Sequence, residues 1–187
     1  MENTILEKEI YITFSRSLGG NGTKTDPYRA VNGEIDPFIF LLGNSCKVRL
    51  GPGNYVTGGF KAPKNFILIG AGKNLTYLKF IDNAKHNYPH VRMITDDGWS
   101  NLFVIKDLTL DGNWNGQSTA SVNGNFKVEP LVVKTIRGKA SNIRVINFGA
   151  NGANYPNLGL EAFPLALATF SNGDPFSYDP RYESLKN

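Results

Sequence analysis

The chain has 187 residues, of which 41% are hydrophobic and 19% are charged, and its formal net charge is +4. This composition excludes a disordered chain and suits a single domain with a sizeable core. Lys and Arg are scattered rather than clustered, so we expect no nucleic-acid partner, and every apolar run is far shorter than the about 20 residues of a membrane-spanning helix. The single cysteine, Cys46, excludes an internal disulfide, and its apolar neighbours predict a buried, unreactive thiol.

Residues 1–45 are expected to form an N-terminal strand, a loop and a cap. The first nine residues lack the apolar core of a secretory signal, which leaves an intracellular protein, a virion component or a chain whose signal has been removed. Asp36 suits a helix N-cap, Pro37 suits the first turn, and Gly43 suits the stop. We therefore predict a short apolar helix over Pro37–Leu42 that covers one end of the core; the alternative is an edge strand.

A short motif recurs three times after this cap. NFILI begins at Asn65, NLFVI at Asn101 and NIRVI at Asn142, so the copies lie 36 and 41 residues apart. A second strand-like run precedes each copy and a third follows it, with Gly, Asn or Asp at the corners. Each unit is therefore predicted to hold about three short strands, and the units to stack as a solenoid with inserted loops at 81–90 and 113–129.

Alternation within the motif predicts which side chains face the core. Like residues should stack upon like at the strand spacing of roughly 4.8 Å. The two predicted inward sets are Phe66, Leu102 and Ile143, and Leu68, Val104 and Val145. Each motif asparagine is predicted to form a left-handed corner whose amide bonds the corners above and below it. The alternative is that the three matches are a coincidence.

The same alternation predicts an apolar outer column. Arg144 should point outward beside Ile67 and Phe103. Further along the motif, the outward positions are Ile69, Ile105 and Ile146. Three isoleucines are unusual on a solvated sheet, so either a loop folds over them or another copy of the chain packs there as a homo-oligomer.

The regular pattern ends near the C-terminus. The stretch FPLALATF, residues 163–170, echoes EPLVVKTI, residues 129–136, but no further motif follows it. We expect one domain over 1–187, with coils over 46–170 and an irregular, polar and aromatic tail over 171–187. The pattern stops within a unit, so further coils or a partner are expected at this end.

Several stretches between Ile10 and Gly152 form a recognisable pattern. They are Gly22-Thr23, Asp26-Pro27-Tyr28, the corner GPGNY at 51–55 and SNLFVIKDLTLDG at 100–112. Together they resemble the N-terminal part of the pectin-lyase-like family. The resemblance implies an all-β, right-handed parallel β-helix of about three to four coils with a short N-terminal capping helix. It also implies carbohydrate work, as in pectate lyases, polygalacturonases and surface depolymerases, with a polysaccharide partner and an extracellular, cell-surface or virion-surface location.

The site residues of this family carry over only in part. The Gly-His-Gly and Arg-Ile-Lys motifs of its hydrolases are absent. For a lyase, the resemblance leaves Asp96, Asp97 and Asp111 as the calcium-binding carboxylates. Arg144 or Arg137 would be the later arginine. Asp96, Asp97 and Arg144 are therefore the catalytic candidates, and each aspartate equally suits a plain turn.

Aromatic residues complete the substrate-binding candidates. Trp99, Trp114 and Tyr88 lie in predicted corners and loops, where an aromatic face can stack on a sugar ring. With Arg137 they form the predicted substrate-binding set. The alternative for Trp99 is a side chain wedged into a corner.

Two functions are compatible with these residues. The first is a carbohydrate-binding or carbohydrate-processing β-helix, which as an enzyme would be a polysaccharide lyase or a glycoside hydrolase whose catalytic coils lie beyond this chain. The alternative is a non-catalytic structural β-helix, such as a spike, a fibre or a surface assembly component. Dependence on calcium would favour the lyase, and a stable oligomer would favour the structural role.

Overall fold

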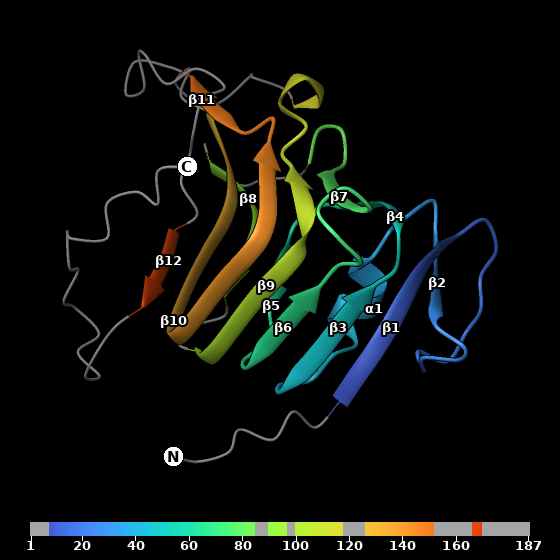
Figure 1. Ribbon diagram of the computed structural model, residues 1–187. Helices are drawn as coiled ribbons and strands as arrows, with labels where there is room; N and C mark the ends of the chain where they lie inside the picture. The colour runs from blue at the N-terminus through green and yellow to red at the C-terminus, as the bar shows by residue number, and fades with distance from the viewer. Residues whose placement is uncertain (1–7, 85–89, 97–99, 118–125, 152–165, 170–187) are drawn as a thin grey trace.

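The computed structural model describes residues 8–84, 90–96, 100–117, 126–151 and 166–169 (Figure 1). Nearly all of the secondary structure in these segments is β. In chain order the elements are β1 (Lys8–Ser15), β2 (Tyr28–Val31), α1 (Asp36–Phe40), β3 (Cys46–Leu50), β4 (Gly53–Thr57), β5 (Phe60–Ala62), β6 (Phe66–Ile69), β7 (Thr76–Phe80), β8 (His90–Asp96), β9 (Ser100–Asp111), the 3-10 turn η1 (Trp114–Gly116), β10 (Phe126–Ile146), β11 (Gly149–Asn151) and β12 (Ala166–Thr169).

The strands stack in three parallel ladders. The first ladder runs β1, β3, β6, the first half of β9 and the middle of β10, with β2 on the far side of β1. The second runs β4, β7, the end of β9 and the end of β10. The third runs β5, β8, the start of β10 and β12. Among the described pairs, only β11 runs antiparallel, against β10. The predicted all-β architecture of stacked, mostly parallel strands is therefore confirmed.

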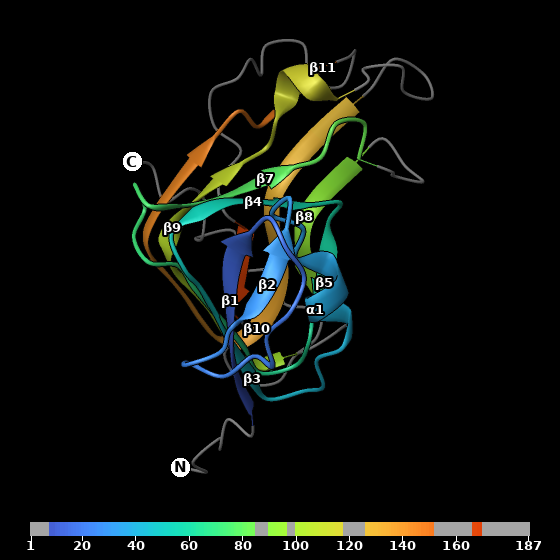
Figure 2. The same cartoon turned by 90° about the vertical axis from the view of Figure 1, so that its right-hand side faces the viewer.

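The ladders surround one continuous core. Figure 2 shows β4 and β7 side by side, with β5, β8 and α1 grouped on another side of the stack. One inward column of the first ladder follows the register from strand to strand. Its members are Ile10, Val48, Leu68 and Ile105, each 2% exposed or less. Burying such a side chain contributes about 1.5–3 kcal/mol, so the stacking itself holds the ladders together.

The register of β9 shows that part of the predicted inward column is wrong. Phe66 of β6 lies opposite Phe103 rather than Leu102. Phe103 and Ile105 are 1% and 0% exposed, whereas Leu102 and Val104 are half-buried. The inward positions Phe66 and Leu68 were predicted correctly, as both are fully buried. A shift of one residue moves every side chain of a strand to the other face, and it does so here.

The corner before β9 explains this shift. The backbone N–H of Asn65 donates to Ser100 Oγ at 2.8 Å, so Ser100 rather than Asn101 bonds the corner at Asn65. Ser100 Oγ in turn bonds the backbone carbonyl of Leu102 at 2.8 Å. Asn101 is an exposed strand residue. The motif copies that look alike in sequence are therefore out of step by one residue.

The third motif copy lies in a different ladder from the first two. Ile143 pairs with Leu108 in the second ladder, and Ile143 and Val145 pack against the core as predicted, although they do not stack on Phe66. Arg144 is exposed, also as predicted.

The predicted outward column of isoleucines is wrong. Ile105 is buried in the core, and Ile146 belongs to the second ladder. Ile69 alternates outward from buried Leu68 but is only 8% exposed. The outer apolar residues of the first ladder are instead Ile67, Ile69, Leu102 and Val104.

Two of the three motif asparagines form the predicted left-handed corners. Asn65 has a φ of 56° and Asn142 a φ of 49°, whereas Asn101 has no positive φ. Asn65 Nδ2 donates to Ser45 Oγ at 3.1 Å, and Asn142 Nδ2 donates to Asp107 Oδ1 at 2.7 Å. Ser45 and Asp107 are themselves left-handed corners, with φ of 60° each. The ladder of corners is thus present, but its rungs join asparagine to serine or aspartate.

The predicted helix near the N-terminus is present as α1. Ile39 of this helix and Ile35, which precedes it, face the core and are 2% and 0% exposed. Asp36 is the first helical residue rather than the N-cap, which is Ile35. The Asp36 carboxylate instead accepts hydrogen bonds from the Thr57 hydroxyl and the Gly58 N–H, tying α1 to the corner between β4 and β5.

Cys46 is 1% exposed, so the predicted burial of its thiol is confirmed, and this burial raises the pKa of the thiol to about 11. None of the helices in the described ranges is long and apolar enough to cross a bilayer.

Candidate binding face on the first ladder

The predicted carboxylate cluster is divided between ladders. Asp96 ends β8 in the third ladder, opposite Ala62. Asp111 ends β9 in the second ladder. Asp97 lies outside the described residues. Within the part of the chain that the structure describes, no three His, Cys, Asp or Glu side chains gather in a way that could hold a metal ion.

Asp111 has a visible structural task. Its Oδ1 accepts the backbone N–H of Asn113 at 2.9 Å and the side-chain amide of Asn147 at 2.8 Å. Asn113 is a left-handed residue with a φ of 49°, so this carboxylate holds the corner at the end of β9 and joins it to the next pass of the chain.

The other predicted site residues are spread over the surface. Arg144 lies opposite Thr109 in the second ladder, and Arg137 lies opposite Leu102 in the first. Arg137 Nε donates to the backbone carbonyl of Asn101 at 3.4 Å. Trp114, in η1, is half-buried and packs against the core. Trp99 and Tyr88 fall outside the described ranges.

The outer surface of the first ladder is basic. The alternation that buries one side of each strand turns the other side outward, and we call these outward residues the first-ladder face. They are Glu9 and Tyr11 of β1, Lys47 and Arg49 of β3, Ile67 and Ile69 of β6, Leu102, Val104 and Lys106 of β9, and Arg137, Lys139 and Ser141 of β10. Five of these twelve are cationic and one is acidic. The apolar residues of β6 and β9 therefore lie between two basic margins, one on β1 and β3 and the other on β10.

Glu9 forms ion pairs with both cations of the basic margin on β1 and β3. Its Oε1 lies 2.6 Å from Arg49 Nε and 3.3 Å from Lys47 Nζ. The hydrogen bond from Arg49 keeps the pKa of Glu9 below its usual value, and the same bond raises the pKa of Arg49. The Arg49 guanidinium carbon also lies 6.0 Å from the centre of the Tyr11 ring. Arg49 is thus a fixed, permanently charged group.

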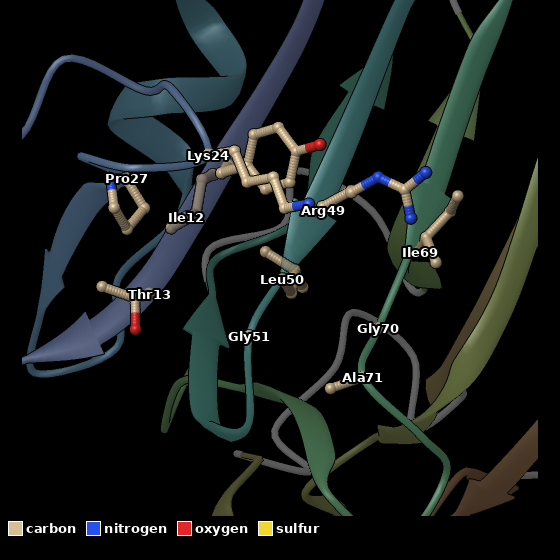
Figure 3. Close-up of a pocket in the computed structure, with 11 residues that line it drawn as sticks. Ile12, Thr13, Lys24, Pro27, Arg49, Leu50, Gly51, Ile69, Gly70 and Ala71 are labelled. Carbon is tan, nitrogen blue, oxygen red and sulfur yellow. The ribbon is translucent and has the colours of Figure 1, made fainter.

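A pocket of about 300 Å³ lies beside this margin (Figure 3). Its walls come from β1, β3, β6 and the loop between β1 and β2. The lining residues are Tyr11, Ile12, Thr13, Lys24, Pro27, Arg49, Leu50, Gly51, Ile69, Gly70 and Ala71. The pocket therefore combines two cationic side chains with an apolar and glycine-rich floor.

This pocket was not predicted from the sequence. It joins residues that lie up to 60 positions apart, from Tyr11 to Ala71, and only the register of β1, β3 and β6 brings them together. The available signal was the alternation of Lys47 and Arg49 with buried residues in KVRL, which places two cations on one outer face.

Comparisons with known proteins give distant phage relatives. No known family profile matches the chain, and no solved structure matches it. The chain is 27% identical over 158 residues to the preneck appendage protein of Bacillus phage PZA, and equally to the pre-neck appendage protein of Bacillus phage phi29; each alignment covers 78% of this chain and 18% of the relative. It is also 27% identical over 124 residues to the putative phage-related protein YobO of Bacillus subtilis (strain 168), covering 63% of this chain and 15% of that protein. The chain thus spans less than a fifth of the length of these curated relatives.

Proposed function

We propose that this chain is a structural segment of a phage appendage, built into the virion as a non-catalytic β-solenoid. The observation that carries the proposal is the 27% identity, over most of the chain, to two proteins named as pre-neck appendage proteins. The uninterrupted ladders support it, because a stack that buries one core along its length is a stiff unit suited to an elongated assembly. A location on the virion surface and contacts with further copies or coils belong to the same proposal.

We also propose the finer architecture of a right-handed β-helix of three to four coils. The chain visits the ladders in a repeating order, with β3, β4 and β5 followed by β6, β7 and β8. Crossovers between parallel strands are almost always right-handed, which supports this hand. In this architecture α1 is the N-terminal cap, since Ile35 and Ile39 close the core beside the first strands. We propose in addition that the chain is related to the pectin-lyase-like family that its sequence motifs resemble.

The structural role is tested on phage particles released by the strain that carries the gene. We expect the protein to sediment with the particles in a density gradient, and antibodies against the chain to label an appendage in electron micrographs. An intact particle band that lacks the protein, with all of it in the soluble fraction, would overturn the proposal. A known capsid protein followed in the same gradient is the control for particle integrity.

A second candidate function is polysaccharide binding or processing along the first-ladder face. The observation that favours it is the set of basic side chains there, including Lys47, Arg49 and Lys139, which suits an acidic polymer. Trp114, half-buried at the corner that follows the second ladder, is the described aromatic candidate for stacking on a sugar.

This second function is tested with anionic polysaccharides in the presence and absence of calcium. Lyase chemistry leaves an unsaturated product that absorbs in the ultraviolet, whereas hydrolysis releases reducing ends without it. Calcium-dependent turnover that is lost in Asp96→Ala or Asp97→Ala, but kept in Asp82→Ala, would establish a lyase. No turnover on any polymer would contradict the processing role.

A further inference from the structure

The pocket beside β1 is a built feature rather than a gap between strands. The loop between β1 and β2 is fastened to β1 by the hydrogen bond from Tyr11 N–H to the Gly22 carbonyl at 2.9 Å. It is closed on itself by bonds from Asn21 N–H and Gly22 N–H to the Asp26 carbonyl at 3.0 Å each. Thr23 Oγ1 accepts the Asp26 N–H at 3.1 Å. Lys24 thus stands on a loop whose backbone is fixed.

Glycine is required where this loop turns. Gly22 has a φ of 81°, and a Cβ there would lie 2.4 Å from the Tyr28 ring. Gly20 has a φ of 83°, and a Cβ there would lie 1.9 Å from the Pro27 carbonyl oxygen. These glycines permit the close approach of the loop backbone, and Lys24 and Pro27 of this loop line the pocket together with Tyr11, Ile12 and Thr13 of β1.

The charges around the pocket are unbalanced. Lys24 is exposed and forms no salt bridge with any carboxylate in the described ranges. Glu9 binds Arg49 through Nε and Tyr11 also hydrogen-bonds the Arg49 side chain, which still leaves part of the five N–H donors of the guanidinium. Lys47 shares the same carboxylate. Three cations face one anion here, and none of the lining residues is acidic.

The floor of the pocket accepts a ligand body. Gly51, Gly70 and Ala71 leave it without bulky side chains, and buried Leu50 and Ile69 make part of it apolar. Figure 3 shows the Lys24 and Arg49 side chains in the upper half of the view, with Gly51, Gly70 and Ala71 below them. A volume of about 300 Å³ lies at the small end of ligand pockets, which run from about 300 Å³ upward.

We propose that this pocket binds a single oxyanion, a phosphate or a carboxylate, carried on a molecule about the size of one sugar. Lys24 and the outer nitrogens of Arg49 are the groups that contact the oxyanion. Guanidinium and ammonium groups make their strongest hydrogen bonds to such oxygens. The apolar and glycine floor takes the uncharged body. This site does not depend on the structural role proposed above, and the failure of either leaves the other untouched.

The test is an amide NMR titration of the full chain at constant ionic strength. The probes are inorganic phosphate, glucuronate, glucose 6-phosphate and, as a neutral control, glucose. We expect saturable shifts confined to the amides of Tyr11, Lys24, Gly51 and Ala71. Lys24→Gln should weaken binding by at least about tenfold, because it removes a charge-assisted hydrogen bond.

Two matched variants separate the site from general electrostatics. Lys24→Arg keeps the charge and a hydrogen-bond donor for the oxyanion, and it should keep binding within about threefold. Lys79→Gln removes an exposed charge from β7 in the second ladder and should leave binding unchanged. Circular dichroism confirms that each variant is folded.

Each outcome of the titration either supports the oxyanion site or overturns it. Binding of phosphate compounds alone, or of glucuronate alone, supports the site and identifies the oxyanion. Absent shifts, equal binding of glucose, equal losses in Lys24→Gln and Lys79→Gln, or shifts spread over the whole first-ladder face would each overturn it.

Discussion

Corner residues with a positive φ set the geometry of this molecule. Asn65 and Asn142 adopt left-handed conformations that cost other L-residues roughly 1–2 kcal/mol, and each also donates an amide hydrogen bond to a neighbouring corner. Asparagine is suited to this place because it tolerates the conformation and supplies the bond. The sequence motif identified these two positions for that reason.

The role of Asn65 leads to a stability prediction. Asn65→Ala should lower the free energy of unfolding by about 1–3 kcal/mol, because it loses both the conformational tolerance and the bond to Ser45. Asn65→Gly should cost less, since glycine keeps the tolerance. Asn101→Ala, at an exposed strand position, should stay within about 0.5 kcal/mol. Urea unfolding measures all three, and equal losses at Asn65 and Asn101 would contradict the corner assignment.

Asp36 leads to a pH prediction. Burial raises the pKa of its carboxyl above the usual 3.8, with the bonds from Thr57 and Gly58 opposing that shift. The folded state therefore holds this proton more tightly than the unfolded state, so the contribution of Asp36 to stability falls as the pH rises from 3.8 through the raised pKa. Glu9 acts in the opposite direction, because its pKa is lowered from 4.5 and its stabilisation is lost as the pH falls.

The measurement is the free energy of unfolding of the natural chain and of Asp36→Asn between about pH 3.5 and pH 6.5. The natural chain should lose stability relative to the variant as the pH rises across this window. A difference that stays constant, or that changes in the opposite direction, would show that Asp36 is not desolvated as described.

At the scale of elements, β9 and β10 carry the stack from one ladder to the next. β9 supplies residues to the first and second ladders, and β10 supplies all three. Asp107, with a φ of 60°, marks the bend within β9. A strand that continues through a corner needs no separate turn, so its register passes directly from one ladder into the next.

The register of β9 can be tested by two neighbouring substitutions. Phe103→Ala removes a ring that is 1% exposed and should cost about 3–5 kcal/mol. Leu102→Ala, on the half-buried outer face, should cost less than about 1.5 kcal/mol. Thermal or urea unfolding gives both values, and a larger loss at Leu102 than at Phe103 would restore the register expected from the motif alone.

Local chemistry predicted more of this fold than similarity between motifs did. The capping helix followed from Pro37 and its apolar neighbours, and the corners at Asn65 and Asn142 followed from the properties of asparagine. The inward positions of Leu102 and Val104 were wrong because aligning the motif asparagines ignored Ser100, whose hydroxyl takes the corner. Which residue fills a corner depends on hydrogen bonds between passes of the chain, and no single pass contains that information.

The candidate site depended even more on contacts between distant segments. The basic alternation in KVRL was visible, but Lys24 reaches the same pocket only because its loop returns across β1 through the bond from Tyr11 to Gly22. The predicted aspartates followed the family resemblance, and the structure separates Asp96 from Asp111 by ladder. The position of Asp111 is explained by a structural role at a corner, because its carboxylate accepts one hydrogen bond from a backbone N–H and one from a side-chain amide.

At the scale of the whole molecule, each pass of the chain lies directly on the previous one. The proposed structural role needs that continuity, and the proposed oxyanion pocket uses only the outer side of the first passes. This stacking is seen in the inward column, in which successive strands place Ile10, Val48, Leu68 and Ile105 opposite one another.

The most direct test of this claim is a methyl NOE spectrum of the chain labelled at Ile, Leu and Val. We expect an unbroken series of contacts from Ile10 to Val48, from Val48 to Leu68, and from Leu68 to Ile105. A contact between Leu68 and Val104 in place of the contact between Leu68 and Ile105, or a break in the series, would contradict the register and with it the single continuous core.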